Sequence, residues 1–82
     1  NLSSNYIYES SLVSLLNQNT ELINYEIEDE IMTLNFNNSI FTHDKILEEV
    51  TYTIKESVCS TYPVKSVILE VEGNVESTNN CN

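Results

Sequence analysis

Two short alternating segments, separated by Asp29 and Glu30, constrain the fold of this chain more than any other feature. Apolar residues alternate with polar ones over residues 23–28 and again over residues 32–37. Alternation with a period of two is typical of a strand that buries one face. If the two residues between the segments form the turn of a hairpin, the apolar residues of both strands lie on one face. The predicted pairs are Ile27 with Met32, Tyr25 with Leu34 and Ile23 with Phe36, and we expect all six side chains to be buried beneath the same pair of helices.

The residues of the turn itself fit a two-residue hairpin poorly. A type I′ turn needs positive φ angles at both positions, and it favours Asn-Gly or Asp-Gly. Glu30 disfavours a positive φ, so we expect the loop to be longer by a residue or two.

Two amphipathic helices are predicted around the hairpin. In residues 8–16 the apolar side chains recur at helical spacing, on one face. The second predicted helix begins at Thr42, a good N-cap, with Phe41 and Ile46 at hydrophobic-staple spacing and Asp44 in the first turn. Its apolar stripe is Leu47, Val50, Ile54 and Val58, and Pro63 ends it.

A third strand is predicted over residues 64–73, with Val67, Leu69 and Val71 on one face. The order helix, strand, strand, helix, strand predicts an α+β fold, a two-layer αββαβ sandwich whose three-stranded sheet carries two helices on one face. The domain is expected to span residues 8–75. Residues 1–7 and 76–82 are expected to be polar flanking segments.

The charge balance excludes two classes of partner. The chain has 13 acidic residues against 3 basic ones, a net charge of −10 in 82 residues. Binding to nucleic acid needs cations that displace counterions from phosphates, so it is disfavoured. Anionic lipid headgroups are disfavoured for the same reason. No apolar run approaches the 18 residues or so that a membrane span needs, so we expect membrane attachment only through an anchor outside this chain.

The acidic residues of the hairpin allow two interpretations. Glu26, Glu28, Asp29 and Glu30 could hold a cation, or they could simply face water. Calcium loops place a Gly at the bend, and this turn has none. We therefore expect a solvated face and no metal or cofactor site.

A thiol nucleophile is the other candidate for chemistry. His43 and Cys59 could pair, but sixteen residues of continuous helix would hold them about 24 Å apart. Cys59 and Cys81 match no zinc or redox spacing. A disulfide between them stays open beside the interpretation that we favour, a buried free thiol at Cys59 and a tail residue at Cys81. The redox compartment is therefore undecided, and we predict no catalytic residue.

Three stretches resemble the Germane (GerMN) domain of sporulation and spore-germination proteins. "SLVSLLNQ" is similar to the leading helix of that family, and "INYEIEDEIMTLNFNNSIF" is similar to its hairpin with an acidic turn. "ILEEVTYTIKESVCSTYPVKSVILEVEGN" resembles its long helix and following strand, which ends here in Glu72 and Gly73. The chain departs from the pattern where the turn lacks Gly and where "NQNT" replaces Gly-Pro.

The resemblance implies a non-enzymatic domain, extracytoplasmic and held by a membrane or lipoprotein anchor in the full-length protein. It implies a fold similar to ring-building motifs, and as partners other envelope or sporulation proteins, self-association included. No residue is assigned as a site, although the surface residues of most interest are Glu26, Glu28, Glu48, Glu49 and Tyr52. Two alternatives are a KH-like binding module, which lacks here its Gly-x-x-Gly loop and basic groove, and a small enzyme acting on peptidoglycan. The enzyme would need carboxylates paired across a groove, whereas Glu48 and Glu49 point about 100° apart on a helix.

Overall fold

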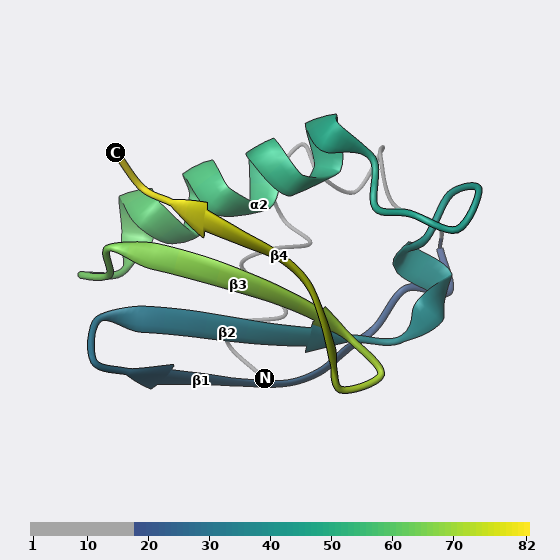
Figure 1. Ribbon diagram of the computed structural model, residues 1–82, viewed down its shortest axis with the longest axis horizontal. Helices are drawn as coiled ribbons and strands as arrows, with labels where there is room; N and C mark the ends of the chain where they lie inside the picture. The colour runs from purple at the N-terminus through teal and green to yellow at the C-terminus, as the bar shows by residue number, and fades with distance from the viewer. Residues whose placement is uncertain (1–17) are drawn as a thin grey trace.

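A computed structural model describes residues 18–82, which form a four-stranded sheet with one long helix packed on one face (Figure 1). The elements are β1 (Leu22–Glu28), β2 (Ile31–Phe36), the short 3-10 helix η2 (Asn38–Ile40), α2 (Glu48–Thr61), β3 (Ser66–Val71) and β4 (Asn74–Asn80). The strands lie in the order β1-β2-β3-β4. The central pair β2–β3 is parallel, and both outer pairs are antiparallel. The α+β class is confirmed, and the three-stranded sheet is wrong. The helix predicted over residues 8–16 lies outside the described residues.

The β1–β2 hairpin is confirmed, and its turn is as short as it can be. Ile27 pairs with Met32, and Tyr25 pairs with Leu34. Asp29 and Glu30 have φ angles of 54° and 65°, the left-handed values that a type I′ turn requires. The expected longer loop is therefore wrong. The two-residue turn matches the twist of the flanking strands, and their pairing holds Glu30 in a conformation that Glu alone disfavours.

The predicted burial of all six hairpin side chains is wrong for β1. Met32, Leu34 and Phe36 on β2 are at most 1% exposed, whereas Ile23, Tyr25 and Ile27 are 48%, 40% and 47% exposed. β1 is an edge strand, while β2 lies in the middle of the sheet. The register also shifts between Leu22 and Asn24, so that Leu22, and not Ile23, pairs with Phe36.

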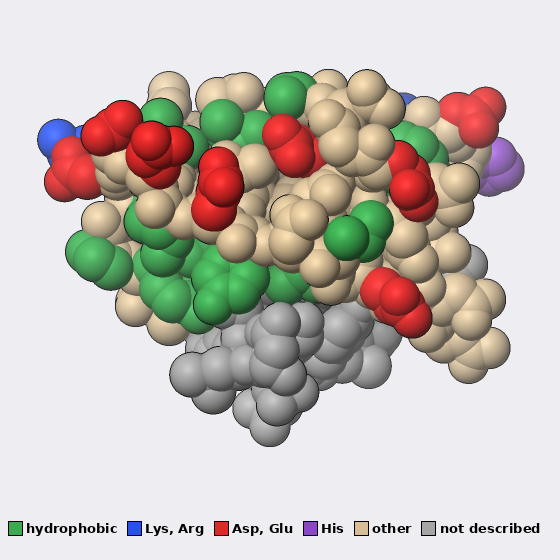
Figure 2. All heavy atoms as spheres, turned by 90° about the horizontal axis from the view of Figure 1, so that it is seen from below, with side chains coloured by type: hydrophobic (Ala, Val, Ile, Leu, Met, Phe, Trp, Pro, Cys, Tyr) green, Lys and Arg blue, Asp and Glu red, His purple; other side chains and the backbone are tan. Residues whose placement is uncertain are grey.

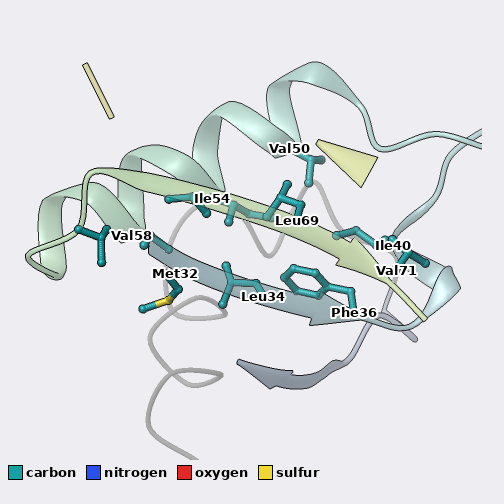
Figure 3. Close-up of a cluster of buried hydrophobic side chains, with 11 residues drawn as sticks. Met32, Leu34, Phe36, Ile40, Val50, Ile54, Val58, Leu69 and Val71 are labelled. Carbon is teal, nitrogen blue, oxygen red and sulfur yellow. The ribbon is translucent and has the colours of Figure 1, made fainter. Parts of the chain in front are cut away.

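The core lies between α2 and the central strands, where Figure 3 shows the buried side chains. The helix contributes Val50, Ile54 and Val58, spaced by four residues on one face. The strand residues of the core are Met32, Leu34 and Phe36 on β2 and Val67, Leu69 and Val71 on β3, with Ile40 and Val64 beside them. The predicted alternation of β3 is confirmed.

The start of α2 differs from the prediction. Thr42 does not cap a helix, because its N–H donates to the Lys45 carbonyl at 2.7 Å and its carbonyl accepts from the Lys45 N–H at 3.3 Å. Between them His43 and Asp44 have positive φ angles of 53° and 67°, so residues 42–45 form a tight turn. The helix begins six residues later than its predicted cap, at Glu48, and Ile46 and Leu47 pack against the core from the preceding extended segment.

Strand β4 replaces the predicted polar tail. Glu72 and Gly73 turn the chain with φ angles of 52° and 85°, and residues 74–80 then pair antiparallel with β3. The Gly73 N–H donates to the Asn35 side-chain oxygen at 2.9 Å. Residues 76–80, expected to flank the domain, lie in this strand. Cross-strand hydrogen bonds hold it in place, among them Ser66 Oγ to Asn80 Oδ1 at 3.1 Å.

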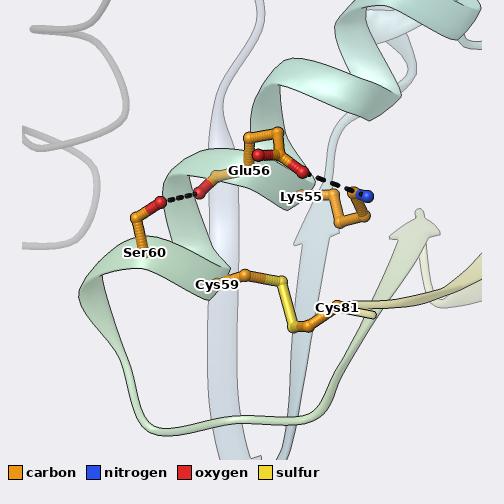
Figure 4. A network of polar contacts seen from close by, with 5 residues as sticks. All are labelled: Lys55, Glu56, Cys59, Ser60 and Cys81. Atoms are coloured by element: carbon orange, nitrogen blue, oxygen red, sulfur yellow. Dashed lines mark hydrogen bonds and ion pairs between the residues drawn. A yellow bond between two sulfur atoms is a disulfide. The ribbon is translucent and has the colours of Figure 1, made fainter.

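A disulfide joins Cys59 on α2 to Cys81, the residue after β4 (Figure 4). The two Cα atoms are 5.8 Å apart. The N–H of Cys81 also donates to the carbonyl of Lys65 at 2.9 Å, so pairing with the chain before β3 continues past the end of β4. The interpretation of Cys59 as a free thiol is therefore wrong, because the unpredicted strand brings Cys81 to the helix.

Replacing Glu30 by glycine is expected to raise the free energy of unfolding. A side chain in the left-handed region costs roughly 1–2 kcal/mol, and glycine has no such cost. Part of this gain is lost to the greater freedom of glycine in the unfolded chain, so we expect a net gain of about 0.5–1 kcal/mol in urea denaturation. The matched control is Glu28→Gly inside β1, which should destabilise. Equal effects at the two positions would contradict a strained turn.

Candidate functional site

A groove of about 640 Å³ lies between α2 and the edge strand β4. Its volume is in the range of ligand-binding clefts. The residues that line it come from the segment leading into α2, the exposed side of that helix and the C-terminal part of the chain; they are Ile46, Glu48, Thr51, Tyr52, Lys55, Ser77, Thr78, Asn79, Asn80 and Asn82.

The helix side of the groove carries one aromatic ring and one cation. Tyr52 is 61% exposed, and the Lys55 ammonium lies 5.1 Å from the centre of its ring. At this distance the ammonium is attracted to the ring face. The same ammonium lies 3.1 Å from the Glu56 carboxylate (Figure 4). The one basic residue that lines the groove is thus already in contact with a carboxylate and a ring.

The strand side of the groove consists of hydroxyl and amide groups. Ser77 and Asn79 pair with Leu69 and Val67, so they lie on the face of the sheet that α2 covers. The Asn79 amide nitrogen donates to the Val67 carbonyl at 3.3 Å and to the Ser77 hydroxyl at 3.1 Å. Polar residues can occupy these core-side positions because the groove beside β4 leaves them partly open to solvent.

The surface residues singled out from the sequence do not form one site. Glu48 and Tyr52 line the groove, while Glu49 on the same helix does not. Glu26 and Glu28 lie on β1, the opposite edge of the sheet, and both are exposed. Glu48 and Glu49 are exposed at the first turn of α2, which favours negative charge near its N-terminus.

The acidic turn of the hairpin is solvated. Asp29 and Glu30 are exposed, and the Glu30 carboxylate lies 3.3 Å from the ammonium of Lys65. This contact lies at the surface, where an ion pair contributes little. Within residues 18–82 no group of three or more His, Cys, Asp or Glu side chains is placed to hold a metal ion.

The proposed pairing of His43 with a nucleophilic thiol does not survive. Cys59 is oxidised in the disulfide, so it has no thiolate to offer. His43 lies in the turn before α2, not at the start of a continuous helix. The separation of about 24 Å assumed one continuous helix from His43 to Cys59, and this assumption is wrong. The pairing is ruled out instead by the disulfide, which leaves Cys59 without a free thiol.

A second surface feature is the apolar face of β1. Figure 2, seen from the β1 side of Figure 1, shows hydrophobic side chains gathered in a patch with acidic side chains along its border. The exposed apolar residues of β1 are Ile23, Tyr25 and Ile27. In the described part of the chain, no helix is long and apolar enough to cross a bilayer.

Comparison with known proteins assigns the family. The sequence model of the Germane family, described as "sporulation and spore germination", matches residues 2–77. The chain belongs to the Germane family. This confirms the resemblance in the helix, hairpin and strand stretches of the sequence. No curated protein matches the chain significantly.

A solved structure agrees with the Germane assignment. The tandem GerMN domains of the sporulation protein GerM from Bacillus subtilis are similar to this chain, with a TM-score of 0.71 and 28% sequence identity. The match covers 82% of this chain and 26% of that one, so this chain spans about a quarter of the matched protein. This chain is therefore a sporulation-related domain with the GerMN fold.

The sequence did not predict the groove, because five of its residues lie in residues 76–82, which were expected to form a polar flanking segment. The one sequence signal for the strand that forms this side of the groove is the dipeptide Glu72-Gly73, which turns the chain from β3 into β4. Gly at the second position of a two-residue turn, directly after an alternating strand, is one part of the hairpin signal, although Glu is a poor residue for the first position. Reading it as a turn would have predicted a further strand and brought Cys81 back toward the helix.

Proposed function

We propose that this chain is a non-enzymatic, extracytoplasmic interaction domain that helps to assemble an envelope complex during sporulation or spore germination. Membership of the Germane family is the observation that carries this proposal. The fold is similar to that of a sporulation protein in which such domains occur in tandem, and this similarity supports a sporulation-related role.

The disulfide supports the extracytoplasmic location. Disulfides persist in oxidising compartments and are rare in a reducing cytosol. Cys59 and Cys81 are half-buried, not fully exposed, and their bond ties the last strand to the helix. A domain that works outside the cytoplasm gains stability from such a bond, and an anchor elsewhere in the full-length protein would hold it at the membrane.

The charge and the surfaces support proteins as partners. A net charge of −10 repels the phosphates of nucleic acids and anionic lipids. Both the apolar face of β1 and the groove beside β4 offer contact surfaces for a folded or extended protein segment. Other envelope or sporulation proteins are the proposed partners, further copies of this domain among them.

The test is photo-cross-linking in sporulating cells that make the full-length protein. A photoreactive phenylalanine analogue placed at Tyr52 reports on the groove, and one at Tyr25 reports on β1. We expect a covalent adduct with an envelope protein at one or both positions, and none with the analogue at the exposed Asn38 at the start of η2. In the same cells, Cys59 and Cys81 should resist alkylation until a reductant is added. Adducts with cytosolic proteins only, or free thiols in the cell, would refute the proposal.

A further inference from the structure

The outer edge of β4 is a free strand edge. Among residues 18–82, β4 pairs with β3 alone, because it is the last strand of the sheet order. The backbone N–H and C=O groups on its other side therefore point away from the sheet, and such an edge is a template for pairing with a further strand.

The groove places this edge beside a helix. Thr51, Tyr52 and Lys55 form one wall, and residues 77–80 form the other. An extended peptide that adds to an edge strand while its side chains contact a neighbouring helix is a recurring mode of recognition. The disulfide sets the spacing of the two walls, since Cys59 lies one helical turn after Lys55 and Cys81 directly follows β4.

Unlike the opposite edge, this edge carries no charged side chain after Glu76. Residues 77–82 carry no charged side chain in a protein of net charge −10. β1, the other edge, carries Glu26 and Glu28 and ends at Asp29 and Glu30. Proteins protect edge strands with charges and bulges, and on β4 the one irregularity lies at Glu76, before the neutral segment.

The negative net charge of the domain favours a positively charged segment as the occupant of the groove. A second copy would also bring a net charge of −10 to the groove, and the two would repel each other. The groove contains Glu48, and its Lys55 is already in contact with Glu56. A cationic segment is attracted by the field of the whole domain.

We propose that the groove between α2 and β4 binds an extended, Lys- or Arg-containing segment of another protein, which adds to β4 as a fifth strand. This rests on the proposed function as an interaction domain, and it names the surface and the chemistry of the partner.

The test uses the full oxidised chain, ¹⁵N-labelled, titrated with a synthetic peptide in which Lys alternates with Val and Thr. We expect chemical-shift changes confined to residues 77–82 and to the Thr51–Lys55 side of α2, together with slower amide exchange in β4. The same peptide N-methylated at alternate residues keeps its side chains and charge but loses main-chain donors. It should bind about tenfold more weakly, because main-chain hydrogen bonds give such complexes their affinity.

A matched pair of variants locates the binding. Thr78→Lys adds a positive charge on the edge and should weaken the lysine peptide about tenfold, by like-charge repulsion at close range. Thr61→Lys adds the same charge on an exposed residue outside the groove and should change the affinity little.

Three results of the titration would overturn the inference. They are equal binding of the N-methylated peptide, shift changes on β1 instead of β4, and shift changes in the groove caused by an oligomer of N-acetylglucosamine while the peptide causes none. The last result would make the groove a glycan site. Cross-linking to an envelope protein from Tyr25 alone would leave the interaction domain standing and refute only the strand-addition groove.

Discussion

Replacing Phe36 by alanine is expected to lower the free energy of unfolding by about 3–5 kcal/mol, the range for a large-to-small change at a buried aromatic residue. Phe36 is 0% exposed, and it pairs with Val71 on β3 and with Leu22 on β1. Its loss leaves a cavity between strands and helix that the surrounding close packing fills only in part. The measurement is urea denaturation of the oxidised protein followed by circular dichroism.

The scale of this effect matters for so small a domain. At 0.05–0.15 kcal/mol per residue, a chain of 82 residues is stable by about 4–12 kcal/mol. The variant would therefore be largely unfolded if the domain lies at the low end of that range. Ile23→Ala is the control, since Ile23 is 48% exposed at the bulge of β1 and should cost less than about 1 kcal/mol. Equal costs at both positions would show that the core does not lie where the structure places it.

Opening the disulfide is expected to cost about 3 kcal/mol. The bond closes a loop across a sequence separation of 22 residues, and the chain-entropy argument gives this magnitude for such a loop. The change is Cys59→Ser with Cys81→Ser, compared with the wild-type protein in its oxidised and reduced forms. The reduced wild type and the double variant should unfold at similar, lower urea concentrations, and a reductant should not shift the double variant.

The loss of stability should be largest in β4. Asn is depleted in strands, and β4 contains three Asn residues and buries no large apolar side chain. The hydrogen bonds between β4 and β3 therefore depend on the disulfide more than the hydrogen bonds between β2 and β3 do. Amide exchange over residues 74–80 should accelerate in the reduced protein, with little change in β2. Uniform acceleration along the chain would contradict the idea that the bond mainly secures the last strand.

The parts of the fold that were predictable from sequence are those where apolar periodicity and burial coincide. Leu34 and Leu69 lie in strands that alternate beneath a helix, and the alternation predicted both strands and the pairing of Leu34 with Tyr25. Tyr25 alternates just as well but lies on an edge strand, where the same pattern no longer means burial. Alternation identifies the strand and the pairs next to the turn, but not the bulge at Ile23 or the place of the strand in the sheet.

The missed features have two physical causes. The side chains that cap helices are also those that form tight turns, so Thr42 could be read either way. β4 has no apolar stripe, because Ser77 and Asn79 take the core-side positions next to the groove. The candidate site depends on this strand, and it could not be assembled from residues that carry no periodic signal.

The bond between α2 and the end of β4 also bears on how the chain matures. Thiols can join only when they meet, and Cys81 reaches Cys59 when the last strand has docked on β3. The docked strand therefore holds the two cysteines in position for oxidation. While the bond is intact, the C-terminal end of β4 stays tethered to the helix even if the strand detaches from β3.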